Sequence, residues 1–306
     1  MARMTTDRHA MGESLRGLAL GDGFGARWFW QRTRAAEMIE QRRTPTGETF
    51  CYTDDTAMAL SVVRALETGK RISQRYLAEL FGATYTADPY RQYGAGMAEL
   101  LPRLFADPGR FAEYAHELFD GAGSLGNGSA MRVAPLGAFL HADLPRVVEQ
   151  AALSATVTHT HREAVDGAVA VAVAAALAAS GRGRAPLPAA EFLGRVAECV
   201  PEGVIRSGIE AAARVDAAMP SWRAADVLGN GQRIRCSDTV PFALWTAAVH
   251  LDDYEEALWA TAAGLGDVDT TCAITGGIVA ARTGIGAAPR VWLELREPLP
   301  AWTDSL

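Results

Sequence analysis

Two short segments place pairs of carboxylates beside a threonine hydroxyl. The first is Thr53-Asp54-Asp55, and the second contains Asp267, Asp269 and Thr270. Neighbouring carboxylates repel one another, so a folded protein buries them together at a high cost unless a cation lies between them. Carboxylate and hydroxyl oxygens are the ligands that Mg²⁺ and Mn²⁺ prefer. Four such carboxylates in one place need about two divalent cations for neutrality, so the two segments together predict a binuclear site.

Each acidic segment also has a simpler interpretation. Met58, Val62 and Leu66 recur at helical spacing after the first segment, and an apolar stretch follows the second from position 270 to about 282. Thr53 or Asp54 in one segment and Asp269 with Thr270 in the other would then be ordinary N-caps. A helix whose first turn is buried carries its capping residues into the core. We therefore expect a metal site only if both helices begin inside the protein.

A third segment, Gly121 to Gly128, holds four glycines and one asparagine in eight positions. Exposed backbone N–H groups in such a loop form concave sites that bind anions, and Ser124 and Asn127 add side-chain donors. The segment matches neither the Walker pattern nor the dinucleotide pattern, and an ordinary flexible loop is the alternative. His159 precedes an expected helix, where its side chain would point towards the same polar site. We expect His161 to be a structural or surface group.

The elements that must position these groups are expected to be helices, because helical spacing of apolar residues dominates the chain. Gly21-Asp22-Gly23-Phe24-Gly25 is expected to end a short helix over residues 15–20. Paired glycines at 276 and 277, inside the last clear helix, predict close packing against another backbone. The tail is expected to be extended. A helical stretch near residues 88–119 is expected to break near Pro102 and Pro108-Gly109, and another helix is expected within 130–140. The remaining helices are expected near 54–66, 73–82, 144–156, 162–180, 189–199, 204–218, 241–250, 254–263 and 270–282.

These patterns predict an all-α fold, a single compact orthogonal multi-helix domain over residues 1–306 with a central binuclear metal cleft. We expect about ten or more helices, which is within the range for a chain of this length. The 49% hydrophobic and 21% charged composition favours a folded chain over a disordered one. A net charge of -7 argues against general nucleic-acid binding. The composition does not indicate an oligomeric state.

The location of the chain is expected to be cytoplasmic. Its four cysteines are scattered, form no C-x-x-C pair and suggest no disulfide framework. No apolar leader opens the sequence. The longest uncharged run, 167–181, falls short of the roughly 20 apolar residues of a membrane span, so we expect a buried core helix there and no membrane partner.

Taken in order, the motifs resemble the ADP-ribosylglycohydrolase family, in particular its dinitrogenase-reductase-activating glycohydrolase type. The resemblance runs from about residue 12 to about residue 284. The family's first motif, G-L-A-x-G-D-x-x-G, stands here at residues 17–25, and its T-D-D-T motif stands at 53–56. Its S-x-G-N-G-x-A-M-R motif stands at 124–132, its T-H pair at Thr158-His159, and its D-x-D-T motif at 267–270.

The resemblance implies a metal-dependent hydrolase that cleaves the N- or O-glycosidic bond of an ADP-ribosylated protein, nucleic acid or small molecule. Asp54 or Asp55 would activate or position the attacking water. The metal ligands that it implies, for two Mg²⁺ or Mn²⁺ ions, are Thr53, Asp54, Asp55, Asp267, Asp269 and Thr270. The residues that it implies for ADP-ribose binding are Gly123, Ser124, Leu125, Gly126, Asn127 and Gly128 for the diphosphate, and His159 for the distal ribose and phosphate.

One position departs from the family pattern. Members that act on proteins commonly carry a glutamate shortly after the first glycine motif, and Phe29 occupies that place here. Glu37, Glu40 or Glu48 in the following segment are candidate replacements. The departure keeps open an alternative, a catalytically impaired protein of the same fold that binds ADP-ribose or a nucleotide. A diphosphate enzyme of the isoprenoid type is disfavoured, because its D-D-x-x-D pattern would need an acid at Met58.

Overall fold

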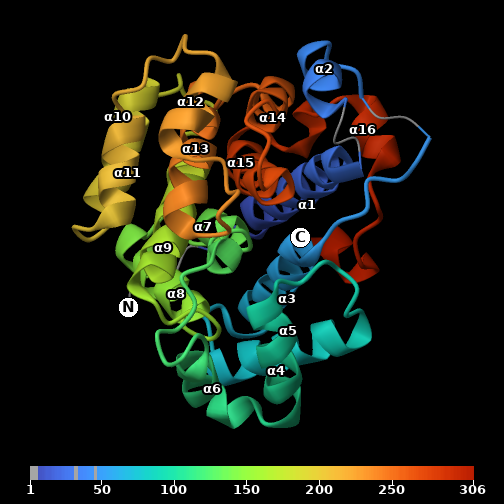
Figure 1. The fold of residues 1–306 in the computed structure, drawn as a ribbon, viewed down its shortest axis with the longest axis vertical. Coiled ribbons are helices and arrows are strands. Elements are labelled where there is room, and N and C mark those ends of the chain that lie inside the picture. The colour runs from blue at the N-terminus through green and yellow to red at the C-terminus, as the bar shows by residue number, and fades with distance from the viewer. Residues whose placement is uncertain (1–5, 31–33, 45–46) are drawn as a thin grey trace.

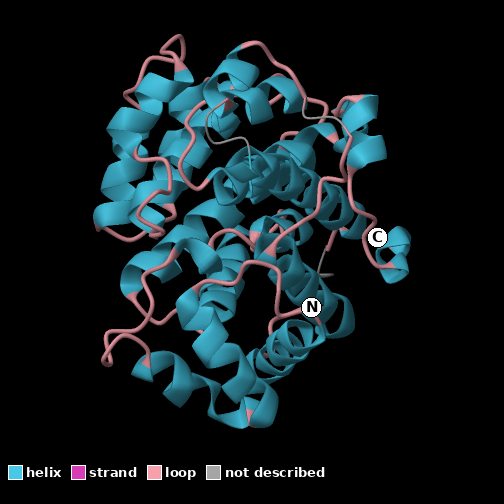
Figure 2. Ribbon diagram, turned by 45° about the vertical axis from the view of Figure 1, so that its right-hand side comes forward, coloured by secondary structure: helices cyan, strands magenta, loops and turns pink. Residues whose placement is uncertain are grey.

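The computed structural model describes residues 6–30, 34–44 and 47–306, and these residues form sixteen α-helices and four short 3-10 helices. Figure 2 shows helices joined by loops throughout the part of the chain that is described. A single parallel bridge between Phe50 and Arg296 joins two loop segments. The prediction of an all-α fold with ten or more helices is confirmed, and the boundaries of 1–306 stay a prediction.

Figure 1 places the helices by label. The α-helices are α1 (Arg8–Trp30), α2 (Ala35–Glu40), α3 (Asp54–Gly69), α4 (Gln74–Ala87), α5 (Ala95–Ala106), α6 (Phe111–Glu117), α7 (Ala134–Phe139), α8 (Leu144–Ala155), α9 (Arg162–Ser180), α10 (Ala189–Glu198), α11 (Val204–Ala212), α12 (Ser221–Leu228), α13 (Cys236–Val249), α14 (Tyr254–Ala262), α15 (Val268–Thr283) and α16 (Arg290–Leu295). The 3-10 helices are η1 (Pro108–Arg110), η2 (Asn127–Ser129), η3 (Ile285–Ala287) and η4 (Ala301–Ser305).

Helices α1 and α15 lie against each other with their backbones in contact (Figure 1). Three glycines of α1, four residues apart, form the contact face. A Cβ atom on Gly17 would lie 2.5 Å from the carbonyl oxygen of Gly276, and one on Gly21 would lie 2.1 Å from that of Cys272. A Cβ atom on Gly25 would lie 2.4 Å from the carbonyl oxygen of Val268. The partners run in reverse order, so the two helices are antiparallel.

The expectation that the glycine cluster at 21–25 ends a helix is wrong. Helix α1 continues through the cluster to Trp30. Each interior glycine costs about 1 kcal/mol relative to alanine, and the close approach of α15 offsets this cost. The expected close packing of Gly276 and Gly277 is confirmed, because Cβ atoms there would lie 2.5 Å from the Gly17 carbonyl oxygen and 2.9 Å from Ala134 Cβ.

Helix α15 is central, and every residue from Val268 to Arg282 is buried. It packs on α1, α9, α13 and α14, so its first turn begins inside the protein. Helix α3 likewise begins inside, because Asp55 and Thr56 in its first turn are buried. The condition set by the sequence, that both acidic segments start buried helices, is therefore met.

Helix α9 is the expected core helix over residues 162–180. By length and composition it could cross a membrane, but 83% of its most apolar window is buried inside the protein. Its alanines and valines pack against α7, α8, α13 and α15. We therefore assign α9 to the core.

Several helix boundaries differ from the sequence-based expectation. Pro102 lies inside α5 instead of breaking it, because the buried Leu100, Leu101 and Leu104 hold that helix against its neighbours. Helix α13 begins at Cys236, five residues before the expected start at Pro241. Helix α12 was not expected, and α11 ends at Ala212, before the expected 218. The tail expected to be extended contains α16 and η4.

We predict that Gly21→Ala destabilises the fold by about 3 kcal/mol, because an added methyl group at a backbone contact forces α1 and α15 apart. Gly194→Ala is the matched control. Gly194 lies inside α10, and a Cβ atom there would have nothing within 4 Å. The control should be neutral or stabilise by up to about 1 kcal/mol. Urea denaturation of both variants measures the difference, and equal stabilities would contradict the proposed backbone contact.

Candidate active site

Asp22 connects the middle of α1 to the first turn of α3. Its carboxylate, fully buried, accepts hydrogen bonds from the backbone N–H and the hydroxyl of Thr53 and from the same two groups of Thr56. The N–H contacts are 3.0 Å long, and the hydroxyl contacts are 2.8 and 2.6 Å long. Burial raises the pKa of Asp22 to about 6, although these hydrogen bonds lower it. Asp22 thus caps α3 in place of Thr53, whose side chain makes no capping bond.

The Thr53 hydroxyl is shared by two carboxylates. Its oxygen lies 2.8 Å from Asp22 Oδ1 and 2.9 Å from Asp55 Oδ2. A hydroxyl group has one proton and can donate to only one of two ionised acceptors. One of the two contacts therefore needs a further proton, or a cation that is bound by both the Thr53 oxygen and the carboxylate oxygen of that contact.

The sequence predicts that the two acidic segments meet. In the structure, each segment lies within the electrostatic field of the other. Burial raises the pKa of Asp54 well above its usual range, and the charges of Asp269 and Asp22 raise it further. Burial acts in the same way on Asp269, followed by the charges of Asp55 and Asp267. Asp55 and Asp269 are buried, whereas Asp54 and Asp267 are half-buried and reach solvent. The negative charge of one segment therefore acts directly on the other.

The donor set fits a hard divalent cation. Asp55 Oδ1 is buried without a hydrogen-bond partner among the described residues, which is costly for a carboxylate oxygen unless a cation contacts it. Within residues 6–30, 34–44 and 47–306, no three His, Cys, Asp or Glu side chains converge into a complete ligand set. The binuclear centre therefore stays a prediction, supported by the oxygen-only chemistry and the uncompensated charge.

The glycine-rich segment meets the second acidic segment through Asn127. The Asn127 side-chain amide donates to Asp267 Oδ2 at 2.7 Å and to Thr239 Oγ1 at 3.0 Å. Asp267 is also in contact with the side chains of Thr270 and Asp269, and burial gives it a raised pKa. The structure thus brings the predicted anion-binding loop to the edge of the acidic cluster.

Neighbouring helices fix the backbone of the glycine-rich segment. The N–H groups of Cys236 and His161 donate to the carbonyl oxygens of Leu125 and Ser124, each at 3.3 Å. Gly123 has a positive φ of 71°, and a Cβ atom there would lie 2.0 Å from Thr160 Oγ1. In the described part of the chain, the backbone N–H groups of Ser124 and Leu125 have no acceptor.

His159 packs against the glycine-rich segment, as the sequence predicts. Cβ atoms on Gly126 and Gly128 would lie 3.5 and 3.0 Å from its Nε2. The ring is buried, and burial followed by the charge of Arg132 lowers its pKa well below the usual value. His159 is therefore a neutral imidazole whose Nε2 edge faces the loop.

Arg132 and Thr158 orient this imidazole. Arg132 is fully buried, and its guanidinium donates to the Ser154 carbonyl oxygen and to Thr158 Oγ1, both at 2.9 Å. Thr158 Oγ1 lies 2.6 Å from His159 Nδ1. The guanidinium also lies over the Phe81 ring, 4.5 Å from its centre. This chain of contacts fixes the plane of the histidine ring.

Glu163 joins α9 to the start of α13. Arg235 donates to both its carboxylate oxygens, and the Ser237 N–H donates at 2.9 Å. Although burial raises the pKa of Glu163, these hydrogen bonds lower it to about 2. His161 accepts a hydrogen bond from the Glu163 N–H at 3.2 Å, so it caps α9 as a structural group. The expectation for His161 is confirmed.

The position of the expected family glutamate is apolar. Phe29 lies near the end of α1 and packs, half-buried, against the core. Among the candidate replacements, Glu48 pairs with Arg27 and Glu37 pairs with Arg43, and both are exposed. Glu40 is exposed at the end of α2. None of the three is in contact with the acidic cluster.

A model of the ADP-ribosylglycohydrolase family matches residues 4–306, nearly the whole chain. The chain belongs to this family. In the structure, the motif segments that contain Asp22, Thr53, Asn127 and Asp267 are joined in pairs by hydrogen bonds, and His159 packs against the segment of Asn127. The dinitrogenase-reductase-activating type is a finer distinction than this match makes.

Individual relatives match over parts of their length. The ADP-ribosylhydrolase ARH3 of Bos taurus is 37% identical over 123 residues, which is 40% of this chain and 33% of that protein. ARH3 of Xenopus tropicalis is 33% identical over 168 residues, 51% of this chain and 46% of that protein. The chain thus spans less than half of the length of either relative.

A solved structure described as an "ADP-ribosylglycohydrolase-related protein complex" has the same fold. Its TM-score is 0.61 at 22% identity, over 95% of this chain and 93% of that chain. At this identity the likeness shows the fold of the family domain and nothing about its substrate.

Sequence reasoning about this family member missed three polar groups of the site. Asp22 and Thr56 stand inside the family motifs, but their residue types and spacing alone predict no role for them. Tyr93 was not singled out; its hydroxyl is buried without a partner among the described residues, and burial followed by the charge of Asp54 raises its pKa. No spacing rule could have found Tyr93, because only the packing of the segment after α4 brings it to Asp54.

We predict that Asp22→Asn destabilises the protein by about 3 kcal/mol, because an amide group would present N–H donors to the donors of Thr53 and Thr56. Asp304→Asn is the control, since Asp304 is exposed and hydrogen-bonds to no side chain in the described residues. Chemical denaturation measures both variants. An Asp22→Asn variant as stable as the control would show that Asp22 does not hold the start of α3.

Proposed function

We propose that the chain is a hydrolase that releases ADP-ribose from an ADP-ribosylated protein, nucleic acid or small molecule, with two Mg²⁺ or Mn²⁺ ions. The observation that carries the proposal is the hydrogen bond from Asn127 to Asp267. It joins a loop with free backbone donors to a cluster of buried carboxylates. A diphosphate on the loop would place the attached ribose beside the acids.

The metal ligands in this proposal are Thr53, Asp54, Asp55, Asp267, Asp269 and Thr270. When bound, the ions would neutralise the acidic cluster and polarise the oxygens of ribose and water. Asp22 lies behind Thr53 and Thr56 and orients the first turn of α3, so we assign it a positioning role. Its hydrogen bonds hold Asp54 and Asp55 in place.

The residues for ADP-ribose in this proposal are Gly123, Ser124, Leu125, Gly126, Asn127, Gly128 and His159. The backbone N–H groups of Ser124 and Leu125 would bind the diphosphate. Neutral His159 would donate from Nε2 to the distal ribose or phosphate. Binding energy from this remote part of the substrate would orient the scissile bond for attack.

Cleavage of the glycosidic bond passes through positive charge on the anomeric carbon. Asp54 or Asp55 would accept the proton of the attacking water, and the surrounding carboxylates would stabilise the charge on the sugar. Phe29 occupies the position of the family glutamate and has no proton to donate. The leaving group would therefore take its proton from solvent or from the molecule that carried the ADP-ribose.

The same departure at Phe29 favours one alternative, a protein that binds ADP-ribose without cleaving it. A panel of substrates with ADP-ribose on arginine, serine, nucleic acid and small molecules, incubated with Mg²⁺ or Mn²⁺, distinguishes the two functions. Release of ADP-ribose from any member supports the hydrolase. Tight binding of ADP-ribose with no release from the whole panel supports the binding protein.

The finer assignments are also proposals. We propose the dinitrogenase-reductase-activating type on the resemblance of the motifs alone. The four free thiols of Cys51, Cys199, Cys236 and Cys272 support a cytoplasmic location.

We predict that Asp55→Ala and Asp269→Ala each abolish Mn²⁺ binding and lower turnover by at least about 10³-fold, because each removes an oxygen ligand from the cluster. Asp304→Ala is the control and should keep both properties. Mn²⁺ titration followed by calorimetry measures binding independently of catalysis. Unchanged Mn²⁺ affinity in both cluster variants would overturn the metal assignment.

We predict that Thr158→Val weakens ADP-ribose binding by about tenfold, because the histidine ring loses its hydrogen bond at Nδ1 and Arg132 loses an acceptor. Thr158→Ser retains the hydroxyl group and should bind as the original chain does. Calorimetric titration with ADP-ribose compares the two variants. Equal affinities would show that the orientation of His159 does not matter for binding.

A further inference from the structure

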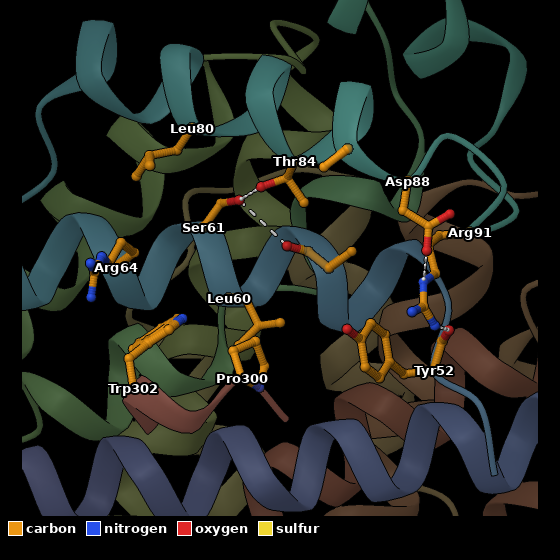
Figure 3. Close-up of a pocket in the computed structure, with 12 residues that line it drawn as sticks. Tyr52, Leu60, Ser61, Arg64, Leu80, Thr84, Asp88, Arg91, Pro300 and Trp302 are labelled. Atoms are coloured by element: carbon orange, nitrogen blue, oxygen red, sulfur yellow. Dashed lines mark hydrogen bonds and ion pairs between the residues drawn. The ribbon is translucent and has the colours of Figure 1, made fainter. Parts of the chain in front are cut away.

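A pocket of about 370 Å³ lies between α3, α4 and the C-terminal segment that contains η4. Figure 3 shows its lining side chains on the facing sides of these elements. None of the residues that line it belongs to the acidic cluster or to the glycine-rich segment. Its volume is in the range of small-molecule sites, which begin at about 300 Å³.

The walls of the pocket are largely apolar. Leu60 of α3, Leu80 of α4 and Pro300 of the C-terminal segment form them. The hydroxyls of Ser61 and Thr84 lie 2.9 Å apart and satisfy each other. An apolar ligand body would therefore meet these walls without leaving an unpaired hydroxyl behind.

The guanidinium group at one end of the pocket is paired with two carboxylates. Arg91 donates to both carboxylate oxygens of Glu297 at 2.8 Å and to Asp88 at 2.7 Å. It also lies over the Tyr52 ring, 4.0 Å from its centre. Burial lowers the pKa of Arg91, but the stronger effect of Glu297 raises it, so this cation stays paired.

The guanidinium group at the other end of the pocket belongs to Arg64. Arg64 lies over the ring of Trp302, 5.0 Å from its centre. Among the described residues, no carboxylate lies within ion-pair distance of Arg64. The pocket therefore has an apolar middle, one end where Arg91 is paired with two carboxylates, and one positive charge at Arg64 at the other end (Figure 3).

We propose that this pocket binds a small amphipathic anion, with its apolar body between Leu60, Leu80 and Pro300 and its charged group on Arg64. Trp302 offers a flat apolar face beside that cation, which suits an aromatic body. A carboxylate and a phosphate share the chemistry that Arg64 recognises. The ligand would join η4 to α3 and α4. The proposal does not depend on the hydrolase activity.

The test uses the full chain and the fluorescent probe 1-anilinonaphthalene-8-sulfonate, an aromatic body with one anionic group. We expect saturable binding of one probe molecule, and a dissociation constant raised about tenfold in Arg64→Met. Ala87→Trp, which places a large ring at the rim of the pocket, should raise it by at least as much. Both positions are exposed, and circular dichroism checks that each variant is folded.

Two controls separate the pocket from other binding sites. Arg195→Met removes a cation from α10, where Arg195 pairs with Glu191, and it should leave probe binding unchanged. Excess ADP-ribose should not displace the probe, because the glycine-rich segment does not line the pocket. Octanoate carries a carboxylate and phenyl phosphate carries a phosphate. The compound that displaces the probe at the lower concentration identifies the preferred anionic group.

Two results would overturn the proposal. One is an unchanged dissociation constant in both Arg64→Met and Ala87→Trp, and the other is displacement of the probe by ADP-ribose. Because the readout is probe binding, neither result bears on whether the chain hydrolyses ADP-ribosylated substrates. Failure of the substrate panel would leave the pocket proposal standing, and the two proposals can fail separately.

Discussion

The site depends on the backbone contact between α1 and α15. Glycines at 17, 21 and 25 remove the side chains that would hold the two helices apart. The close approach places Asp22, in the middle of α1, near the buried first turn of α15. Because α15 is surrounded by other helices, its Asp269 and Thr270 are buried as well. The helix crossing thus brings Asp22 and Asp269 into the same part of the interior.

The same crossing creates an electrostatic cost. Burial raises the pKa of each carboxylate in the cluster, and the charges of its neighbours raise those of Asp54, Asp55 and Asp269 further. Hydrogen bonds from Thr53 and Thr56 offset part of the cost, but most of them are directed to Asp22, and only the Thr53 hydroxyl also contacts Asp55 Oδ2. Asp55 Oδ1 has no such partner in the described residues. The remaining charge is what makes divalent cations the natural complement of the site.

The polar groups around the cluster are held by contacts distant in sequence. Asn127 reaches Asp267, and Arg132 reaches His159 through Thr158. The Arg235–Glu163 ion pair joins the loop before α13 to α9. These contacts keep the glycine-rich segment in a fixed position with free backbone donors. The pocket beside α3 is separate from these contacts. Among the described residues that line the pocket, Arg64 is the one cation without an ion-pair partner.

The sequence alone determined the helical class, the two acidic segments and the glycine-rich segment, because each depends on local periodicity or on residue type. It also identified close packing at Gly276 and Gly277. It misjudged Gly21 to Gly25, because a glycine cluster ends a helix in isolation but permits a helix crossing when a partner backbone lies against it. The partner is set by residues 268–276, more than 240 positions away.

Only the tertiary structure decided that Asp22 holds the start of α3 and that the Tyr93 hydroxyl lies near Asp54. It also decided that Arg64 has no counter-charge among the described residues. Each of these facts depends on which segments pack together, and the number of possible pairings is not limited by local sequence. Residue types and spacing therefore predicted the chemistry of the site, whereas packing between distant helices decided its burial, its orientation and its neighbours.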